Sequence, residues 1–278
     1  MTRPAFIWRN GQPIAADEAC VGVLNPAIYG AYGVYESMQM ANGVIFEPEA
    51  HLRRLARSAA ILELALPAGL EQIGAWIDAV AEAADAPDCV IRLFVVGPDD
   101  DEEPNVYIWS QPAPRYPESL YQRGATAVTF EAQRFLPQAK SLNSLASYMA
   151  QRHARAAHAE EAFLYHDGCV TEGSKSSVFA VVDGELRTAP EADVLAGVTR
   201  EIVIDLTRRA GIPFQEARLP LAEIGQWEEC FITSTSRHVM PVSVIDGRPV
   251  GTGEVGPLTT RLAALFEDYF ADSLARAR

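Results

Sequence analysis

A chain of 278 residues, 49% of them hydrophobic, can bury one large core or two cores of ordinary size without disulfide staples. Its formal net charge of -14 argues against a nucleic-acid surface, because phosphate binding requires clustered Lys and Arg. The amino-terminal residues lack the basic start and long apolar core of a signal peptide, and no apolar run elsewhere is long enough to cross a bilayer. We therefore expect a soluble, cytoplasmic protein.

The first half of the chain is predicted to alternate hairpins, helices and strands. Asn-Gly pairs flanked by apolar residues predict two β-hairpins, and apolar residues three or four apart predict two amphipathic helices. These elements are expected at 6–14 and 34–46 (hairpins), after 49 and over 70–84 (helices), and at 89–96 and 105–109 (strands). The acidic run 99–103 is expected to be a solvated loop.

The segment 111–117 contains three prolines and predicts the boundary between two domains. We expect an N-terminal α/β domain at 1–113, a linker at 114–117 and a larger C-terminal domain at 118–278. Strand-rich halves with interspersed helices favour an α+β two-domain fold over a doubly wound sheet. The C-terminal elements are expected at 125–130, 230–235 and 242–245 (strands), 167–168 and 183–184 (Asp-Gly turns), and 143–158, 199–210 and 258–275 (helices).

Lysine is rare in this sequence, since only Lys140 and Lys175 are lysines among 23 basic residues. Lys140 lies between an apolar stretch and a predicted helix start, a setting that can desolvate its amine. Burial lowers the pKa of an amine and leaves a neutral nitrogen that can attack an aldehyde, as a Schiff-base lysine must. The alternative is a structural lysine at a helix start.

Glu172 lies in a small polar segment between two apolar strand runs, where a ligand can approach the backbone closely. A carboxylate held against a pyridine nitrogen keeps that nitrogen protonated, and the ring then withdraws electrons from a breaking Cα–H bond. The alternative is an ordinary turn carboxylate paired with Lys175.

Two clusters of hydrogen-bond donors are suited to an anion. Residues 195–201 precede a predicted helix, so backbone N–H groups and the Thr199 hydroxyl would point at its N-terminus. The alternative is a Thr N-cap without a ligand. Ser234, Thr235 and Ser236, at the end of a predicted strand, offer a second set of donors, and one phosphate could use both.

Arg92 interrupts an otherwise apolar strand, where its guanidinium needs a partner. We expect either a buried ion pair with an acidic side chain or a clamp for a substrate carboxylate. No metal site is predicted, because the histidines are scattered and His153 and His158 do not share one side of a helix. The motifs G-x-G-x-x-G, Walker A and G-x-S-x-G are absent, which argues against dinucleotide, triphosphate and serine-hydrolase chemistry.

Six motifs, in this order along nearly the whole chain, resemble the fold-type IV pyridoxal-phosphate enzymes. These are the class IV aminotransferases, which include branched-chain and D-amino acid aminotransferases and 4-amino-4-deoxychorismate lyase. The motifs are Gly33-Val-Tyr-Glu36, His51-Leu-Arg-Arg-Leu55, Ala139-Lys-Ser-Leu-Asn143, Thr171-Glu-Gly-Ser174, Leu195-Ala-Gly-Val-Thr-Arg200 and Phe231-Ile-Thr-Ser-Thr235.

The resemblance implies pyridoxal 5′-phosphate as the cofactor, bound between two domains, and a homodimer whose interface completes the substrate pocket. It implies that Lys140 is the Schiff-base lysine and proton shuttle and that Glu172 binds the pyridine nitrogen. Tyr35 would line the substrate pocket, and Arg134 would approach the cofactor's phenolic oxygen. The implied phosphate ligands are Arg54, Val198, Thr199 and Thr235, with Ser234 and Ser236 beside them.

Departures from the family pattern leave the substrate open. The sequence Lys-Ser-Leu-Asn at 140–143 resembles D-amino acid aminotransferases, but Val95-Val-Gly-Pro-Asp99 replaces their arginine-and-histidine carboxylate trap. Arg92 resembles the arginine that helps branched-chain enzymes to hold a distal substrate carboxylate, yet the tyrosine expected two residues earlier is Val90. Arg237 occupies a position that is usually small, which makes it a candidate for a relocated carboxylate clamp.

The resulting hypothesis is a transaminase that moves an amino group between an amino acid, of branched-chain L or D type, and a 2-oxo acid. It predicts ping-pong kinetics, with the amino group stored as pyridoxamine. One alternative is 4-amino-4-deoxychorismate lyase on the same scaffold. The other is a catalytically silent binding protein, which would show no yellow colour.

Overall fold

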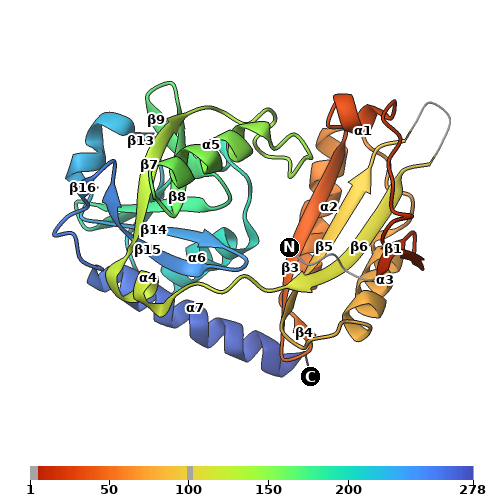
Figure 1. Ribbon diagram of the computed structural model, residues 1–278. Coiled ribbons are helices and arrows are strands. Elements are labelled where there is room, and N and C mark those ends of the chain that lie inside the picture. Colours follow the sequence, from red (N-terminus) through yellow and green to blue (C-terminus); the bar gives the residue numbers. More distant parts are fainter. Residues whose placement is uncertain (1–5, 99–102, 278) are drawn as a thin grey trace. The chain divides into compact units, whose positions relative to one another are not determined.

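The computed structural model describes residues 6–98 and 103–277 (Figure 1). Its helices and largely antiparallel strands confirm the predicted α+β class. The chain forms two compact units. The described residues of Met1–Pro114, Ala139–Asn143 and Ala271–Arg278 form the first unit, and Arg115–Gln138 with Ser144–Phe270 form the second. The sequence-based division had instead assigned both 139–143 and 271–278 to the C-terminal domain. Most of the predicted acidic loop, including Asp99, lies outside the described residues.

The first unit is built on an antiparallel sheet of six strands in the order β2-β1-β6-β5-β3-β4. Both predicted hairpins are present, and their Asn-Gly turns have the positive φ angles that tight hairpins require. Helices α2 and α3 pack against this sheet, as their apolar spacing predicted. The elements are β1 (Phe6–Arg9), β2 (Gln12–Ala15), α1 (Pro26–Tyr29), β3 (Gly33–Ala41), β4 (Val44–Ile45), α2 (Pro48–Ile61), α3 (Leu70–Glu82), β5 (Cys89–Val96) and β6 (Asn105–Pro112).

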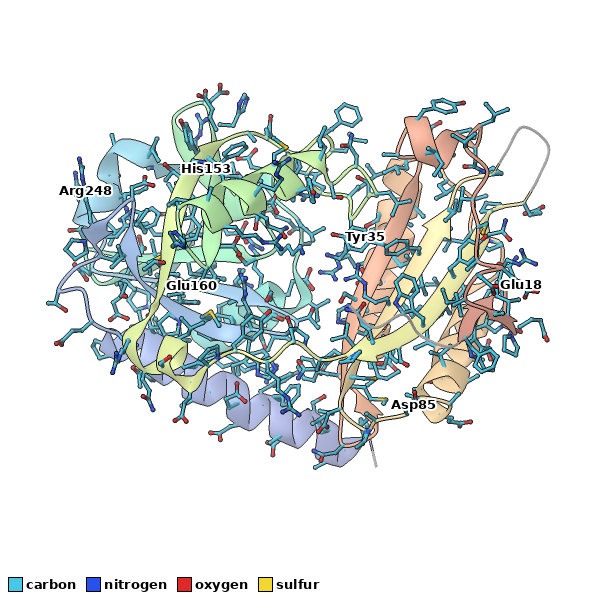
Figure 2. The ribbon with its side chains drawn as sticks, in the orientation of Figure 1. Glu18, Tyr35, Asp85, His153, Glu160 and Arg248 are labelled. Carbon is cyan, nitrogen blue, oxygen red and sulfur yellow. The ribbon has the colours of Figure 1, made fainter. Side chains whose placement is uncertain are left out.

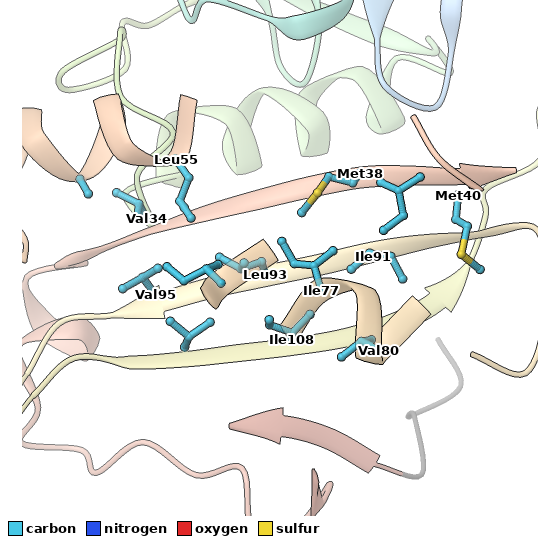
Figure 3. Close-up of a cluster of buried hydrophobic side chains, with 14 of the residues drawn as sticks. Val34, Met38, Met40, Leu55, Ile77, Val80, Ile91, Leu93, Val95 and Ile108 are labelled. Carbon is cyan, nitrogen blue, oxygen red and sulfur yellow. The ribbon is translucent and has the colours of Figure 1, made fainter. Parts of the chain in front are cut away.

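Alternation along β3 places every second side chain in the core of this unit (Figure 3). Val34, Met38 and Met40 are buried there in one cluster with residues of α2 and α3. The same alternation puts Glu36 on the core-facing side of the strand, where it is fully buried. A carboxylate in such a position requires polar partners.

The second unit contains a sheet of ten strands, of which six close into a ring because β9 pairs with β10 as well as with β8. The ring runs β10-β14-β15-β7-β8-β9, and its buried residues, such as Phe163, Val178 and Ile232, form the second core. The strands are β7 (Ala125–Glu131), β8 (Glu161–His166), β9 (Cys169–Gly173), β10 (Ser177–Val182), β11 (Glu185–Thr188), β12 (Phe214–Glu216), β13 (Leu219–Pro220), β14 (Glu229–Ser234), β15 (His238–Ile245) and β16 (Arg248–Pro249).

The remaining helices confirm three predicted elements and add one. They are α4 (Glu118–Arg123), α5 (Leu145–Ala156), α6 (Val198–Arg209) and α7 (Pro257–Arg276). Helix α5 begins at Leu145, two residues after the predicted start near 143, and the preceding residues 139–143 instead form a β-bridge to β3 through Ser141. Within the described residues, no helix combines the length and the apolar character needed to cross a membrane.

Candidate active site

The residues singled out from the sequence fall into two groups, one in each unit. The first unit holds Lys140, Tyr35, Arg54 and Arg92. The second holds Glu172, Arg134, Val198, Thr199, Ser234, Thr235, Ser236 and Arg237. In the part of the chain that the structure describes, no cluster of three or more His, Cys, Asp or Glu side chains is placed to hold a metal ion.

Lys140 is fixed to β3 by its backbone. The Tyr35 N–H donates to the Lys140 carbonyl at 2.9 Å, and Val34 forms an antiparallel bridge with Ser141. The Lys140 N–H in turn donates to Ser58 Oγ of α2 at 3.0 Å. Residues that oppose each other across an antiparallel pair point to the same face, so the lysine side chain lies on the Tyr35 face of the strand. Its Nζ is 4.6 Å from the centroid of the Tyr35 ring.

Tyr35 (Figure 2) and Arg92 share this face, because Tyr35 opposes Phe94 and Ser37 opposes Arg92 in the β3–β5 register. The Arg92 guanidinium carbon lies 5.5 Å from the Tyr35 ring centroid and 5.6 Å from that of Phe94, and Nη1 donates to Ser37 Oγ at 3.4 Å. Its Nε is buried without a hydrogen-bond partner among the described residues. Burial lowers the pKa of Arg92. These contacts are with rings and a hydroxyl rather than with the carboxylate of a structural ion pair, which leaves the guanidinium suited to a ligand anion.

The buried carboxylate of Glu36 is satisfied by residues of α2. Its Oε1 accepts from Arg54 Nε at 2.8 Å, and its Oε2 accepts from Arg54 Nη2 at 2.7 Å and lies 2.9 Å from His51 Nδ1. Burial by itself raises the pKa of Glu36, but Arg54 and His51 outweigh it and hold that pKa far below its usual range. Burial also lowers the pKa of His51, so the cluster is in essence an Arg54–Glu36 ion pair. Glu36 and Arg54 belong to two of the six motifs of the sequence, but their pairing was not predicted.

The Glu36 cluster predicts a stability effect. We expect Glu36→Gln to lower the free energy of unfolding by about 3–5 kcal/mol, because it leaves the buried Arg54 without its counter-charge. Since the pKa of Glu36 is lowered on folding, its stabilisation is present above pH 4.5 and is lost progressively as the pH falls below that value. Urea unfolding at pH 7 and pH 4 measures both effects. Glu82, an exposed carboxylate of α3, serves as control, and Glu82→Gln is expected to change the free energy of unfolding by less than about 0.5 kcal/mol. Equal losses in the two variants would contradict this account.

Glu172, near the end of β9, is held by Arg134. Arg134 Nε donates to Glu172 Oε1 at 2.7 Å and Nη2 to Oε2 at 3.3 Å, and Nη2 also donates to the Pro137 carbonyl. Both side chains are only 9% exposed. The sequence predicted a role for each residue but not this contact, which fixes the carboxylate in one orientation.

Ser177 connects Glu172 to the predicted anion site. In the sheet it opposes Glu172 on one side and Thr233 on the other. A Cβ at Gly197 would lie 3.1 Å from Ser177 Oγ, so the N-terminus of α6 lies beside this row of strands. The N-cap of α6 is Gly197, and Thr199 is the buried second residue of the helix; the alternative of a Thr199 N-cap is therefore wrong. The first amides of a helix have no partner within it, and an anion can accept from them.

The second predicted donor cluster lies at the end of β14, next to the residue that opposes Ser177. Strand β14 ends at Ser234, one residue beyond Thr233, and α6 packs against β14. In the turn that follows, the Ser236 hydroxyl lies 3.3 Å from the Tyr116 hydroxyl, and the Arg237 N–H donates to Ser234 Oγ at 3.3 Å. The structure thus brings Glu172, the α6 N-terminus and the 234–236 hydroxyls to one part of the second unit.

The Arg237 guanidinium has a protein partner that the sequence did not reveal. Its Nη1 lies 2.5 Å from Oε2 of Glu161, a carboxylate that is 1% exposed. Burial by itself lowers the pKa of Arg237, but Glu161 outweighs it and raises that pKa above its usual value. Arg237 is therefore already paired with an anion of the protein.

The chemistry of the two groups fits a phosphorylated pyridine aldehyde. In the first unit an amine stands against an aromatic ring on a sheet face that also holds a guanidinium. In the second unit an oriented carboxylate, a helix N-terminus and a set of hydroxyls lie in one region. Pyridoxal 5′-phosphate presents an aldehyde to an amine, a ring nitrogen to a carboxylate and a phosphate to amide and hydroxyl donors.

Comparisons with known proteins point the same way. The family model described as amino-transferase class IV matches residues 33–245. A putative branched-chain-amino-acid aminotransferase of Methanocaldococcus jannaschii is 33% identical, over 94% of this chain and 95% of that protein. A D-alanine aminotransferase of Listeria innocua is 32% identical, over 96% of each. A solved structure of a branched-chain amino acid aminotransferase with pyridoxamine 5′-phosphate, from the source abbreviated T.th., superposes with a TM-score of 0.89 at 29% identity, covering 98% of this chain and 95% of that one.

Proposed function

The chain belongs to the class IV aminotransferases and is a pyridoxal 5′-phosphate-dependent enzyme that transfers amino groups, and we propose that its Lys140 binds the cofactor and moves the proton. The observation that carries this assignment is the double attachment of the Lys140 backbone, to β3 and to Ser58, which fixes its amine against Tyr35. When bound, pyridoxal 5′-phosphate supplies an aldehyde for the substrate's amino group and a ring that withdraws electrons from its Cα.

In this proposal Lys140 Nζ would take a proton from the substrate Cα and return it to C4′ of the cofactor, the carbon of its aldehyde group. The backbone contacts of Lys140 limit where Nζ can move, which favours transfer between these two nearby carbons. Tyr35 packs beside Nζ and would exclude water from this side.

Glu172 is the proposed partner of the cofactor's ring nitrogen, and Arg134 orients its carboxylate. The earlier prediction that Arg134 approaches the phenolic oxygen remains a prediction. The amides of Val198 and Thr199, the Thr199 hydroxyl and the 234–236 hydroxyls are the proposed phosphate donors, supported by their common location. Arg54 stays a predicted phosphate ligand, although its Nε and Nη2 bind Glu36.

We propose Arg92 as the residue that holds a distal substrate carboxylate. Its Nε lacks a partner among the described residues, whereas the Arg237 guanidinium pairs with Glu161. At saturating cofactor, we expect Arg92→Gln to raise the KM for 2-oxoglutarate about tenfold and the KM for pyruvate much less, because only the former has a distal carboxylate. Steady-state kinetics with the two acceptors measures this. If Arg237→Gln produces that pattern and Arg92→Gln does not, the clamp is Arg237.

The substrate amino acid is proposed to be of the branched-chain L type or of the D-alanine type, since both kinds of enzyme are similar to this chain. A half-reaction with a single amino acid and no acceptor tests the assignment. A transaminase accumulates pyridoxamine 5′-phosphate, which is monitored by the loss of visible absorbance, whereas 4-amino-4-deoxychorismate lyase does not. A panel of L- and D-amino acids then identifies the accepted stereochemistry. No conversion with any member of the panel would contradict the proposal.

We also propose a cytoplasmic homodimer. Apolar side chains of the second unit are exposed on either side of segment 139–143, including Phe135 at 69%, Leu145 at 67% and Tyr148 at 56%. Exposed apolar patches of this kind mark interaction surfaces, and a second copy of the chain is the commonest partner. Sedimentation analysis of the purified protein distinguishes a dimer from a monomer.

A further inference from the structure

Glu161, at the start of β8, is a buried carboxylate with an unusually complete set of donors. Its Oε1 accepts from the backbone N–H of Ala162 at 2.9 Å and of Ser174 at 3.1 Å, and also from the Ser174 hydroxyl. Its Oε2 accepts from the Ser176 hydroxyl at 2.8 Å and from Arg237 Nη1 at 2.5 Å. None of these residues has a role in the chemistry proposed above for the cofactor.

Two of these partners belong to the turn that follows Glu172. This turn is tight, since the Gly173 N–H donates to the Ser176 carbonyl at 2.7 Å. A Cβ at Gly173 would lie 2.0 Å from Ser176 Oγ and 3.2 Å from the Glu161 carboxyl group, so the turn is closed directly onto Glu161. The position of Glu172 therefore depends on a turn that Ser174 and Ser176 anchor to this carboxylate.

Another partner of Glu161, Arg237, belongs to the turn that carries Ser234, Thr235 and Ser236. Its N–H binds Ser234 Oγ, its carbonyl accepts from the Tyr121 hydroxyl at 3.2 Å, and its guanidinium carbon lies 5.4 Å from the Tyr116 ring centroid. The Tyr116 ring and Glu161 thus hold the guanidinium of Arg237. Because Arg237 is part of the turn, these contacts also hold the backbone of the turn in place. Breaking a buried pair of this kind leaves an uncompensated charge.

We propose that Glu161 is a positioning residue whose carboxylate ties the turn carrying Glu172 to the turn carrying Ser234, Thr235 and Ser236. It thereby sets the separation between the group assigned to the ring nitrogen and the groups assigned to the phosphate. This inference rests on the proposed function of those residues. Arg237 takes part through its ion pair with Glu161, which holds the turn of Ser234, Thr235 and Ser236 in place.

Replacing Glu161 must weaken the binding of a ligand that contacts both turns more than the binding of a ligand that contacts only one. Joining two binding groups in one molecule multiplies their affinities only when the geometry permits simultaneous contact. For Glu161→Gln, we therefore expect the Kd of pyridoxal 5′-phosphate to rise about tenfold. The Kd of inorganic phosphate and that of unphosphorylated pyridoxal should each change by less than about twofold. Calorimetric titration of the full chain, freed of cofactor, measures all three.

Two further variants complete the test. Ser176→Ala removes one donor to Glu161 but keeps the ion pair with Arg237, so we expect it to fold even if Glu161→Gln does not. The Kd of this variant for pyridoxal 5′-phosphate should rise about threefold, while its Kd values for inorganic phosphate and for pyridoxal should not change. The exposed Glu131, on the neighbouring strand β7, provides the control, because Glu131→Gln should leave all three values as in the wild type. Equal weakening of all three ligands, or no weakening of any, would overturn the positioning role. A wild-type protein that fails to bind pyridoxal 5′-phosphate would instead refute the proposed function on which it rests.

Discussion

Replacing Lys140 with alanine is expected to lower the rate of amino transfer by at least about 10³-fold, because the variant lacks both the amine that binds the cofactor and the base at Cα. Steady-state assays with the preferred donor and acceptor measure the loss. The sequence supplies a matched control, since Lys175 is its only other lysine and is exposed. We expect Lys175→Ala to retain the wild-type rate to within about twofold.

The Lys140 variants also separate chemistry from folding. Lys140→Ala leaves the backbone bonds to Tyr35 and Ser58 in place, so its unfolding curve should match that of the wild type. A variant that folds normally and still transfers amino groups at a comparable rate would show that another group performs the proton transfer.

The second large effect is expected for Glu172→Gln. An amide cannot hold a proton on the ring nitrogen as a carboxylate does, so we expect kcat to fall about 10²–10³-fold. Pyridoxal 5′-phosphate methylated at the ring nitrogen carries a fixed positive charge and should restore part of that rate. The surface carboxylate of Glu185, paired with Arg187 at 2.9 Å, is the control, and Glu185→Gln should leave kcat unchanged. Failure of the methylated cofactor to raise the rate of Glu172→Gln above that with the natural cofactor would contradict the assigned role.

Most elements of the fold were predictable because their signals are local. The Asn10-Gly11 and Asn42-Gly43 pairs adopt positive φ and turn the two hairpins, and the apolar spacing of α2 and α3 marks the faces they bury. The segment around Lys140 had no such signal. Its bridge joins Ser141 to Val34, more than a hundred positions earlier in the chain, and pattern reasoning cannot see a pairing at that distance.

The site was predictable as a set of residue types and only partly as a set of contacts. Lys140, Glu172 and Arg92 stood out because each is a polar group in an apolar setting. The contacts of the site had no such signal, because the residues that pair are far apart in the sequence. Arg134 lies 38 positions from Glu172, and Arg237 lies 76 positions from Glu161. The buried position of Glu36, by contrast, has a local signal. The alternation of Val34, Met38 and Met40 places this carboxylate on the core-facing side of the strand.

Mass spectrometry of the protein after incubation with pyridoxal 5′-phosphate and reduction with borohydride tests the central claim most directly. The account predicts a protein that is yellow before reduction. After reduction, it predicts a single adduct, on the peptide that contains Lys140. A protein that stays colourless and carries no adduct, or one whose adduct lies on Lys175, would contradict it.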